Sequence, residues 1–529
     1  MDRERRQRLS RLAAEHKGGP CMGIQLDMWT CTHTKTSYAC INIGTVVEPD
    51  HVVKQEVKHE EAPNRGQKLP QLRVQSEVLD FNQFPFTSHT ANNIKEWLLE
   101  TLKAHGIALT SISGVTPDGA SDGVAAVNSI PELCLKLDTC LLHGLQRAVL
   151  YSIGLAGSTP KNPEARATQQ NPEAKQLLRK HNRFAQASNQ IRAVAYGIRE
   201  MQKDDGVPAS RILATVDTMP TRWGNQYRQV QRNNSLKTTL DAVVGRWKRE
   251  HNSKPDAIVE LDPQDDPNSK VGVPVPAQNL GMSGDEWDMS LEMEAFLEHP
   301  FQIKESIEHK GYMTGAQGLI VLADLMKGCA NDKPLVVKLH PPTAKLVDRK
   351  RKDELRPARL LCPVIAAGRT VLAKELRERF FDGAEVPSDV RLVQLYMTKQ
   401  MPMEDWAPAT WMASAKALYT KYLRDAAATQ GAQPKRTVAA EQGRQAACSD
   451  AGPGLFRNIF QPPPAPATAT EADTTPPEDA VSFEIAMWKT IDQTTLQPFI
   501  DVDGLLNEMA LMYKLRHSFP LHYRVFKQA

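Results

Sequence analysis

The spacing of apolar residues in the first third of the chain predicts an α/β fold. Residues 37–47 (SYACINIGTVV) alternate with a period of two, which is typical of a half-buried strand, and the largely apolar run 21–30 precedes them as a first strand. Residues 88–105 change to helical spacing, and residues 107–115 return to a strand pattern. A third strand at 51–59 and two helices at 123–137 and 138–154 complete the prediction for this region.

The rest of the chain favours helices, separated by two segments that are rich in turn formers. Helical patterns lie at 160–250, 283–311, 314–327, 343–355, 370–381 and 481–529. Residues 251–278 are rich in Pro, Asp, Asn and Ser and predict a loop. Residues 432–480 are rich in Pro and Ala and contain few large apolar residues, so we expect a disordered linker there.

Composition narrows the class of protein. The chain has 529 residues, a formal net charge of +3 and 24% charged residues, which is ordinary for a folded protein of two or more domains. Its eight cysteines contain no C-x-x-C pair, so we expect a reducing compartment rather than a disulfide scaffold. The charged N-terminus has no signal-peptide core, and the apolar runs are too short to span a bilayer, so we expect neither secretion nor membrane insertion.

Two aspartates lie close to the ends of predicted strands. Asp27 lies near the end of the first strand, and Asp118 follows the fourth. Carboxylates on neighbouring strands are the hard oxygen ligands that a two-metal phosphoryl-transfer site requires, usually together with a third carboxylate. The alternative is that each aspartate only forms a turn or caps a helix, where Asp is also favoured, and the spacing does not decide between the two.

Cys140 and His143 lie one helical turn apart in Cys-Leu-Leu-His. A thiolate and an imidazole at this spacing can bind one Zn²⁺, but a four-coordinate site needs two further ligands. His33 or Cys134 would have to join them, because no partner pair is visible nearby. The alternative is a buried cysteine and a hydrogen-bonded histidine on a core helix.

Arg222 and Trp223 place a guanidinium beside a large aromatic ring. This pair suits a DNA-binding site, because arginine binds phosphate and tryptophan stacks on an unpaired base. The alternative is that Trp223 packs in the core at the start of a helix and Arg222 is its surface neighbour.

In chain order, four motifs resemble the catalytic region of the hAT superfamily of DNA transposases. They are residues 26–30 (LDMWT), 115–122 (VTPDGASD), 140–146 (CLLHGLQ) and 221–227 (TRWGNQY). In the second motif, Gly119 and Asp122 replace two asparagines of the family. Weaker similarity continues through Glu286-Trp287 and Trp488 to Phe519-Pro520-Leu521.

The resemblance implies a ribonuclease-H-like mixed sheet with a large helical insertion and C-terminal helices. It implies Asp27 and Asp118 as catalytic, metal-binding carboxylates for Mg²⁺ or Mn²⁺, Arg222 and Trp223 as DNA-binding residues, and cut-and-paste DNA transposition as the ancestral reaction. It also implies DNA as a partner, a homo-oligomer formed through the C-terminal helices, and a nuclear location, for which residues 349–352 (RKRK) are the densest basic run.

The expected organisation follows from the patterns and the resemblance together. It is a basic N-terminal helix or tail (1–20), the first part of the ribonuclease-H-like domain (21–155), the remaining core elements with the insertion (156–431), the linker (432–480) and the start of a dimerisation segment (481–529).

Two departures from the family change the expected activity. The family's third carboxylate lies in a Ser-Glu-Arg context beyond Phe-Pro-Leu, and no such motif follows here; Glu484 and Glu508 are candidate replacements. No paired Cys and His spacing precedes Asp27, so we expect no zinc finger. These departures predict a sequence clipped at both ends, or a decayed or repurposed copy that is inactive as written. The alternative function is a non-enzymatic DNA- or protein-binding factor on a domesticated transposase scaffold.

Overall fold

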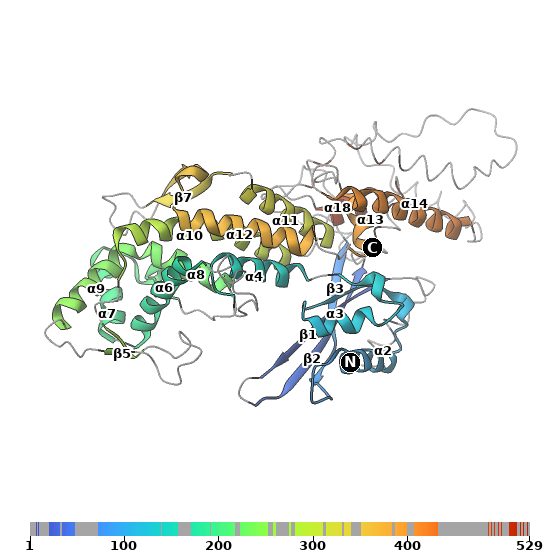
Figure 1. Ribbon diagram of the computed structural model, residues 1–529, viewed down its shortest axis with the longest axis horizontal. Helices are drawn as coiled ribbons and strands as arrows, with labels where there is room; N and C mark the ends of the chain where they lie inside the picture. The colour runs from blue at the N-terminus through green and yellow to red at the C-terminus, as the bar shows by residue number, and fades with distance from the viewer. Residues whose placement is uncertain are drawn as a thin grey trace, which may run out of the picture. The chain divides into compact units, whose positions relative to one another are not determined.

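The protein divides into two compact units (Figure 1). The computed structural model describes residues 7, 9, 21–31, 34–47, 72–138, 140–156, 171–190, 192–216, 223–251, 258–260, 274–276, 281–309, 314–330, 333–339, 351–382, 387–398, 407–431, 485, 488, 491, 496, 499, 507–515, 519, 522 and 526. Unit 1 comprises Met1–Leu141, His309–Ile320 and Ala384–Ala529, and unit 2 comprises Leu142–Glu308 and Val321–Gly383. Unit 1 is mixed α/β, whereas the described part of unit 2 is mostly helical.

The elements of unit 1 are β1 (Met22–Thr30), β2 (Ser37–Val47), β3 (Arg73–Gln83), α2 (Ala91–Ala104), η2 (Leu109–Ser111), β4 (Ile112–Pro117), α3 (Ser121–Asn128), η3 (Cys134–Lys136), α13 (Asp389–Met397), α14 (Ala409–Gly431) and α18 (Glu508–Leu515). Unit 2 contains all or most of α4 (Leu141–Ser152), α6 (Pro172–Gln190), α7 (Arg192–Asp204), η4 (Ala209–Arg211), α8 (Trp223–Ser235), α9 (Lys237–His251), β5 (Ile258–Glu260), β6 (Pro274–Pro276), α10 (Gly284–His309), α11 (Gly315–Ala330), β7 (Leu335–Leu339), β8 (Lys352–Arg356), η7 (Ala358–Leu360) and α12 (Pro363–Phe380).

The sheet of unit 1 has four strands in the order β3-β2-β1-β4. β1 pairs antiparallel with β2 and parallel with β4, and β2 pairs antiparallel with β3. Beyond β4, Leu137 forms an isolated parallel bridge with Val115. The sheet is therefore mixed, with its antiparallel strands on one side of β1 and its parallel pairing on the other.

Helices α2 and α3 cover one face of this sheet (Figure 1). Alternate residues of β1 and β2, such as Ile24, Leu26 and Ile41, pack against Trp97 and Leu98 of α2. Because successive side chains of a strand point to opposite faces, Gln25, Asp27 and Trp29 belong to the other face. The alternation of apolar residues in 37–47 therefore reflects the burial of one face of β2.

A second core in unit 1 joins α13, α14 and α18. It contains Met397, Tyr419 and Leu511, together with Trp488 and Phe519. The apolar residues of α18 are buried within this core. Association through the C-terminal helices stays a prediction.

Unit 2 is organised around α10. Eight successive positions of this helix, from Ser290 to Leu297, are buried, so α10 is covered on all sides instead of exposing one face. The sequence predicts a helix at 283–311, which α10 confirms, but over Ser290–Leu297 this helix has no exposed polar face. α10 also contains Pro300 in its interior.

Several predicted elements are confirmed with shifted ends. β1, β2, α2 and β4 occupy the expected places. The helices expected at 123–137 and 138–154 are shorter, because η3 and the bridge at Leu137 interrupt them before α4 begins. Residues 432–480, 51–59 and most of 1–20, which carried the predicted linker, third strand and N-terminal helix, lie outside the described residues.

Strands β3, β5, β6, β7 and β8 differ from the prediction, and β5 and β6 lie inside the loop expected at 251–278. β3 (RVQSEVLDFNQ) was not predicted. Among its described residues Leu79 is the one that is buried, and a single buried position leaves no period-two pattern in the sequence. A helix was expected over 343–355, but residues 352–356 form β8, which pairs with β7. The residues KDELR include strong helix formers, and pairing with a neighbouring strand overrides that weak local preference.

Candidate functional site

Asp27 lies in β1, and Asp118 directly follows β4, the neighbouring strand of the sheet in unit 1. The last registered pair between β1 and β4 is Leu26 with Pro117, and each aspartate is the next residue along its strand direction. The pairing is parallel, so the two residues leave this last pair on the same side. Their common edge of the sheet is therefore the candidate site.

Asp27 is exposed and lies inside β1, so it neither forms a turn nor caps a helix. Its carboxylate makes no hydrogen bond or ion pair with another residue that the structure describes. The structural alternative raised for Asp27 is thus wrong. The side chain is available to a ligand from solvent.

Asp118 has a partly structural role. Its Oδ1 accepts a hydrogen bond from the backbone N–H of Ala120 at 3.0 Å, which forms a turn that leads into α3. Gly119 inside this turn has φ of 85°, a conformation that Gly and Asn adopt more readily than other residues. Oδ2 of Asp118 has no hydrogen-bond partner within the described part of the chain. One carboxylate oxygen therefore stays available beside Asp27.

The strand next to β1 places a thiol beside Asp27. Cys40 is the cross-strand partner of Asp27. Burial raises the pKa of its thiol, and the charges of Asp27 and Asp80 raise it further. Asp27 and Cys40 thus share the face of the sheet that α2 and α3 leave uncovered, whereas Asp80, which pairs with the core residue Ile41, belongs to the other face. The thiol stays protonated.

Three aromatic rings extend from this site along the same face. Trp29 stacks on Tyr38 with 5.7 Å between ring centroids and on Phe81 with 5.4 Å. Trp29 and Phe81 keep 38% and 56% of their surface exposed. Exposed stacked rings are able to bind an unpaired base. Only the strand register brings these residues together, so the sequence spacing gave no signal for the cluster.

The Cys140 and His143 motif opens α4. Both side chains are partly exposed and both have partners in the structure. A Cβ added at Gly144 would lie 2.2 Å from Cζ of Phe380, so this glycine allows α12 to approach α4 closely. Among the described residues, no group of three or more His, Cys, Asp or Glu side chains could hold a metal ion. The motif thus begins a helix that packs against α12, but Cys140 is partly exposed and not buried as the alternative supposes.

Trp223 is the first residue of α8 and is 2% exposed. Its ring meets that of Phe301 edge-on, with 6.2 Å between centroids. A buried ring has no face available to a DNA base, so the geometry favours the packing alternative for Trp223. Arg222 lies outside the described residues.

Glu508, a candidate third carboxylate, is buried at the start of α18. Its carboxylate accepts hydrogen bonds from the hydroxyls of Thr398 and Thr314. Burial raises its pKa to about 7, although both hydroxyls act to lower it. Glu508 is thus held in a protein interior and does not join Asp27 and Asp118 in a metal-binding group. Glu484 lies outside the described residues.

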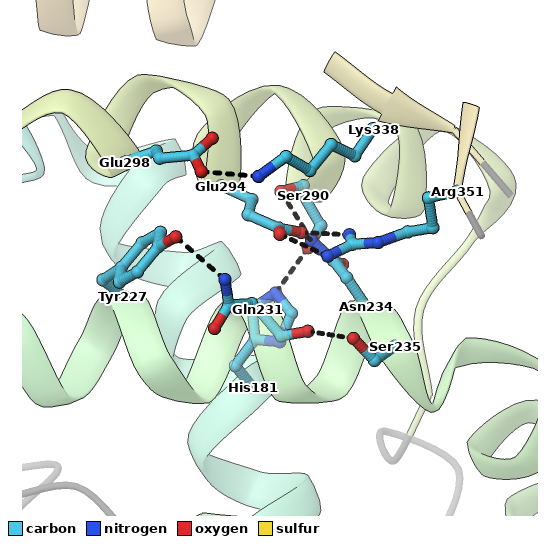
Figure 2. A network of polar contacts seen from close by, with 10 residues as sticks. All are labelled: His181, Tyr227, Gln231, Asn234, Ser235, Ser290, Glu294, Glu298, Lys338 and Arg351. Atoms are coloured by element: carbon cyan, nitrogen blue, oxygen red, sulfur yellow. Dashed lines mark hydrogen bonds and ion pairs between the residues drawn. The ribbon is translucent and has the colours of Figure 1, made fainter. Parts of the chain in front are cut away.

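Unit 2 contains a polar network that sequence reasoning missed (Figure 2). The ring of His181 shares hydrogen bonds with Asn233 at Nδ1 and with Ser290 at Nε2, at 3.1 and 2.8 Å. The Ser290 hydroxyl donates to Asn234, whose amide donates to Glu294 at 2.8 Å. An amide nitrogen can only donate, so Nδ1 of His181 accepts and Nε2 carries the proton.

The network ends in a buried ion pair. Both oxygens of Glu294 accept from the guanidinium of Arg351, each at 2.6 Å. Glu292, on the same helix, pairs with Arg356 at 2.6 Å. Two glutamates inside a fully buried stretch of helix need such partners, because an unpaired buried charge is costly. The position of both glutamates in an apolar run indicates that they need charged partners. The spacing of residues in the sequence does not identify which arginines these partners are.

No protein-family model and no curated protein matches the chain. None of the described helices combines the length and apolarity needed to cross a membrane.

Proposed function

We propose that the chain is a derivative of hAT-type DNA transposases in which Asp27 and Asp118 bind a divalent cation, Mg²⁺ or Mn²⁺, at a DNA phosphate. The observation that carries the proposal is the register of β1 with β4, which makes the two aspartates neighbours at one edge of the sheet. The four sequence motifs are a second, independent support.

The strand order supports a ribonuclease-H-like sheet as the scaffold. Such a sheet has three antiparallel strands followed by parallel strands on the far side of the first. The order β3-β2-β1-β4 has this arrangement, and the parallel bridge of Leu137 lies where a fifth strand would run. Gly119 also supports the motif that contains Asp118, since a positive φ suits the asparagine that the family has there.

The donor set fits one cation. Two carboxylates from adjacent strands, with one oxygen of Asp118 already used in its turn, leave several coordination positions for water or phosphate. Mg²⁺ is commonly bound in this way, through one or two carboxylates together with substrate phosphates. When bound, the ion supplies charge neutralisation at a phosphate and activation of water.

The residues of the chain have separate roles in this proposal. Asp27 is the exposed ligand, since it has no competing partner in the described structure. Asp118 is oriented by its turn hydrogen bond, which fixes the carboxylate against the strand end. Strand cleavage is the ancestral reaction, and DNA binding is what we expect the chain to retain.

Binding of DNA in Mg²⁺ and in EDTA tests the proposal. Native protein should bind DNA more tightly in Mg²⁺, and Asp27→Asn and Asp118→Asn should each abolish the difference. Asp122→Asn is the matched control, because Asp122 is an exposed acid in the first turn of the adjacent helix α3. Equal binding in Mg²⁺ and EDTA would contradict the proposal. Nicking of a supercoiled plasmid that needs both aspartates would extend it to catalysis.

The exposed aromatic cluster supports a second candidate, a non-enzymatic DNA-binding factor. Trp29, Tyr38 and Phe81 form a stack on which unpaired bases can lie, and this binding needs no metal. It predicts binding to single-stranded DNA in EDTA that Phe81→Ala weakens and that Asp27→Asn leaves intact. Binding that is lost with Asp27→Asn would exclude this candidate.

A further inference from the structure

Unit 2 contains a cavity that the proposed function does not use. Its volume is about 340 Å³, and it lies among α10, α11, β7 and α12. Pockets that bind small molecules commonly have about 300–1,000 Å³. Phe296, Leu325 and Leu335 form part of an apolar wall, and Arg369 and Lys333 line the same space. The cavity is thus amphipathic and large enough for a compact organic molecule.

Arg369 is an unusual wall residue, because it is charged and only 4% exposed. Its Nη2 donates to the carbonyl oxygen of Gly328 at 2.8 Å. Its Nη1 is buried and has no hydrogen-bond partner, and no described carboxylate forms an ion pair with the guanidinium. A buried charge without a counter-ion is costly, and a buried donor without an acceptor adds to that cost. The site therefore has a place for an anion.

The other groups around the cavity do not supply that anion. The carboxylate of Glu298 is paired with Lys338 at 2.5 Å. Burial raises the pKa of the Cys329 thiol to about 11, although the nearby charge of Arg369 and a hydrogen bond with its side chain act to lower it. Cys329 is therefore neutral at pH 7, and neither group cancels the charge of Arg369.

A second cation reinforces the positive charge. Lys333 is exposed at the cavity and forms no ion pair with a described residue. Burial lowers the pKa of His299 in the same wall; the charge of Asp324 raises it and that of Lys333 lowers it. His299 is therefore neutral and able to share a hydrogen bond with a ligand. The described wall thus has two unpaired cations, Arg369 and Lys333, and no unpaired anion.

We propose that this cavity binds a small organic anion, a carboxylate or a phosphate monoester with a compact apolar body. Its charged oxygens contact the guanidinium of Arg369 and the ammonium of Lys333, and its body packs on Phe296 and Leu325. Because Arg369 is almost fully buried, the ligand has to enter the cavity. A free small molecule can enter the cavity. A backbone phosphate of DNA cannot, because the strand that carries it is too wide.

Calorimetric titration of the full chain with three probes tests the proposal. The probes are phenyl phosphate, benzoate and inorganic phosphate, at constant ionic strength in NaCl. We expect saturable binding of phenyl phosphate or benzoate, about tenfold tighter than inorganic phosphate because the ring adds apolar contact. The tighter of the two organic probes identifies the charged group that the site prefers.

Three variants assign the binding to this cavity. Arg369→Gln should weaken the organic probe about tenfold or more, and Lys333→Gln, at an exposed position, about three- to tenfold. Lys374→Gln is the matched control, since Lys374 is exposed on α12 and, among the described residues, forms an ion pair only with Glu378, at 3.7 Å. It should leave the dissociation constant unchanged.

The proposal is overturned if no organic probe gives saturable heat. It is also overturned if Lys333→Gln, or a folded Arg369→Gln, binds as tightly as Lys374→Gln. Lys333→Gln decides the matter even if Arg369→Gln does not fold, because its exposed side chain makes no ion pair in the described structure. Equal affinity for inorganic and phenyl phosphate would contradict the role of the apolar wall.

Discussion

Two sets of carboxylates, Glu294 in unit 2 and the pair Asp27 and Asp118 in unit 1, are in opposite environments. In unit 2, Glu294 is buried and both of its oxygens accept from Arg351. In unit 1, Asp27 is exposed and has no described partner, and Asp118 uses one oxygen in a turn. Both kinds of carboxylate are fixed by regular structure, on a helix in one case and on strands in the other.

Burial and the presence of partners distinguish a structural carboxylate from one that is available to a ligand. A buried carboxylate needs its partners for folding, so its removal should cost stability. An exposed, unpaired carboxylate on a rigid strand contributes little to folding, so its removal should change ligand binding instead. Four predictions test this contrast, in order of decreasing effect on the free energy of unfolding.

Glu294→Ala should have the largest effect. It leaves Arg351 buried without a counter-ion and also removes the acceptor of the Asn234 amide. Loss of one partner from a buried pair costs about 3–5 kcal/mol in the free energy of unfolding, which urea denaturation measures. Glu354→Ala is the control, because Glu354 also pairs with an arginine but keeps 45% of its side chain exposed. Equal losses in the two variants would contradict the contrast.

His181 should make unit 2 sensitive to acid. Burial lowers the pKa of this ring to about 3. In the unfolded chain the pKa is about 6.5, so below that pH the unfolded state takes up a proton that the folded state does not. Between pH 6 and pH 4 the free energy of unfolding should fall by about 2.5 kcal/mol from this group. Denaturation of native protein and His181→Asn at both pH values measures the difference, which should be smaller in the variant.

Glu508 should give the opposite dependence in unit 1. Its pKa is raised to about 7 by burial, above the value of about 4.3 in an unfolded chain. Its contribution is therefore complete below about pH 4 and is lost as the pH rises towards 7, by about 2 kcal/mol between pH 5 and 6.5. Glu508→Gln stays neutral, so its stability relative to native protein should increase over this range. A constant difference would show that Glu508 is not held protonated.

Asp27→Asn should have the smallest effect on folding. Its side chain is exposed and makes no hydrogen bond or ion pair within the described residues. We expect a change of less than about 0.5 kcal/mol in the free energy of unfolding, by the same urea assay. A loss as large as that of Glu294→Ala would make Asp27 a structural residue.

The same contrast explains how much could be predicted from the sequence. β1, β2 and α2 were predicted because each buries one face, which leaves a period in the apolar residues. β3 and β8 were missed because most of their side chains are exposed, so their sequences contain little periodic signal. Secondary structure held by strand pairing alone is invisible to such patterns.

The candidate site was predictable only where it follows strand ends. Asp27 and Asp118 were found because each lies at a strand that the pattern predicts, and parallel pairing then makes them neighbours. The cluster of Trp29 with Phe81 depends on register across β2, and the pair of Glu294 with Arg351 depends on tertiary packing. Sequence spacing within one element cannot supply either partner.

Binding of Mn²⁺, followed by electron paramagnetic resonance, distinguishes one shared metal site from two separate surface acids. Native protein and the control Asp122→Asn should bind Mn²⁺ with the same affinity, whereas Asp27→Asn and Asp118→Asn, both folded, should each lose that binding. Native affinity in either of these two variants would contradict a shared site at the edge of β1 and β4.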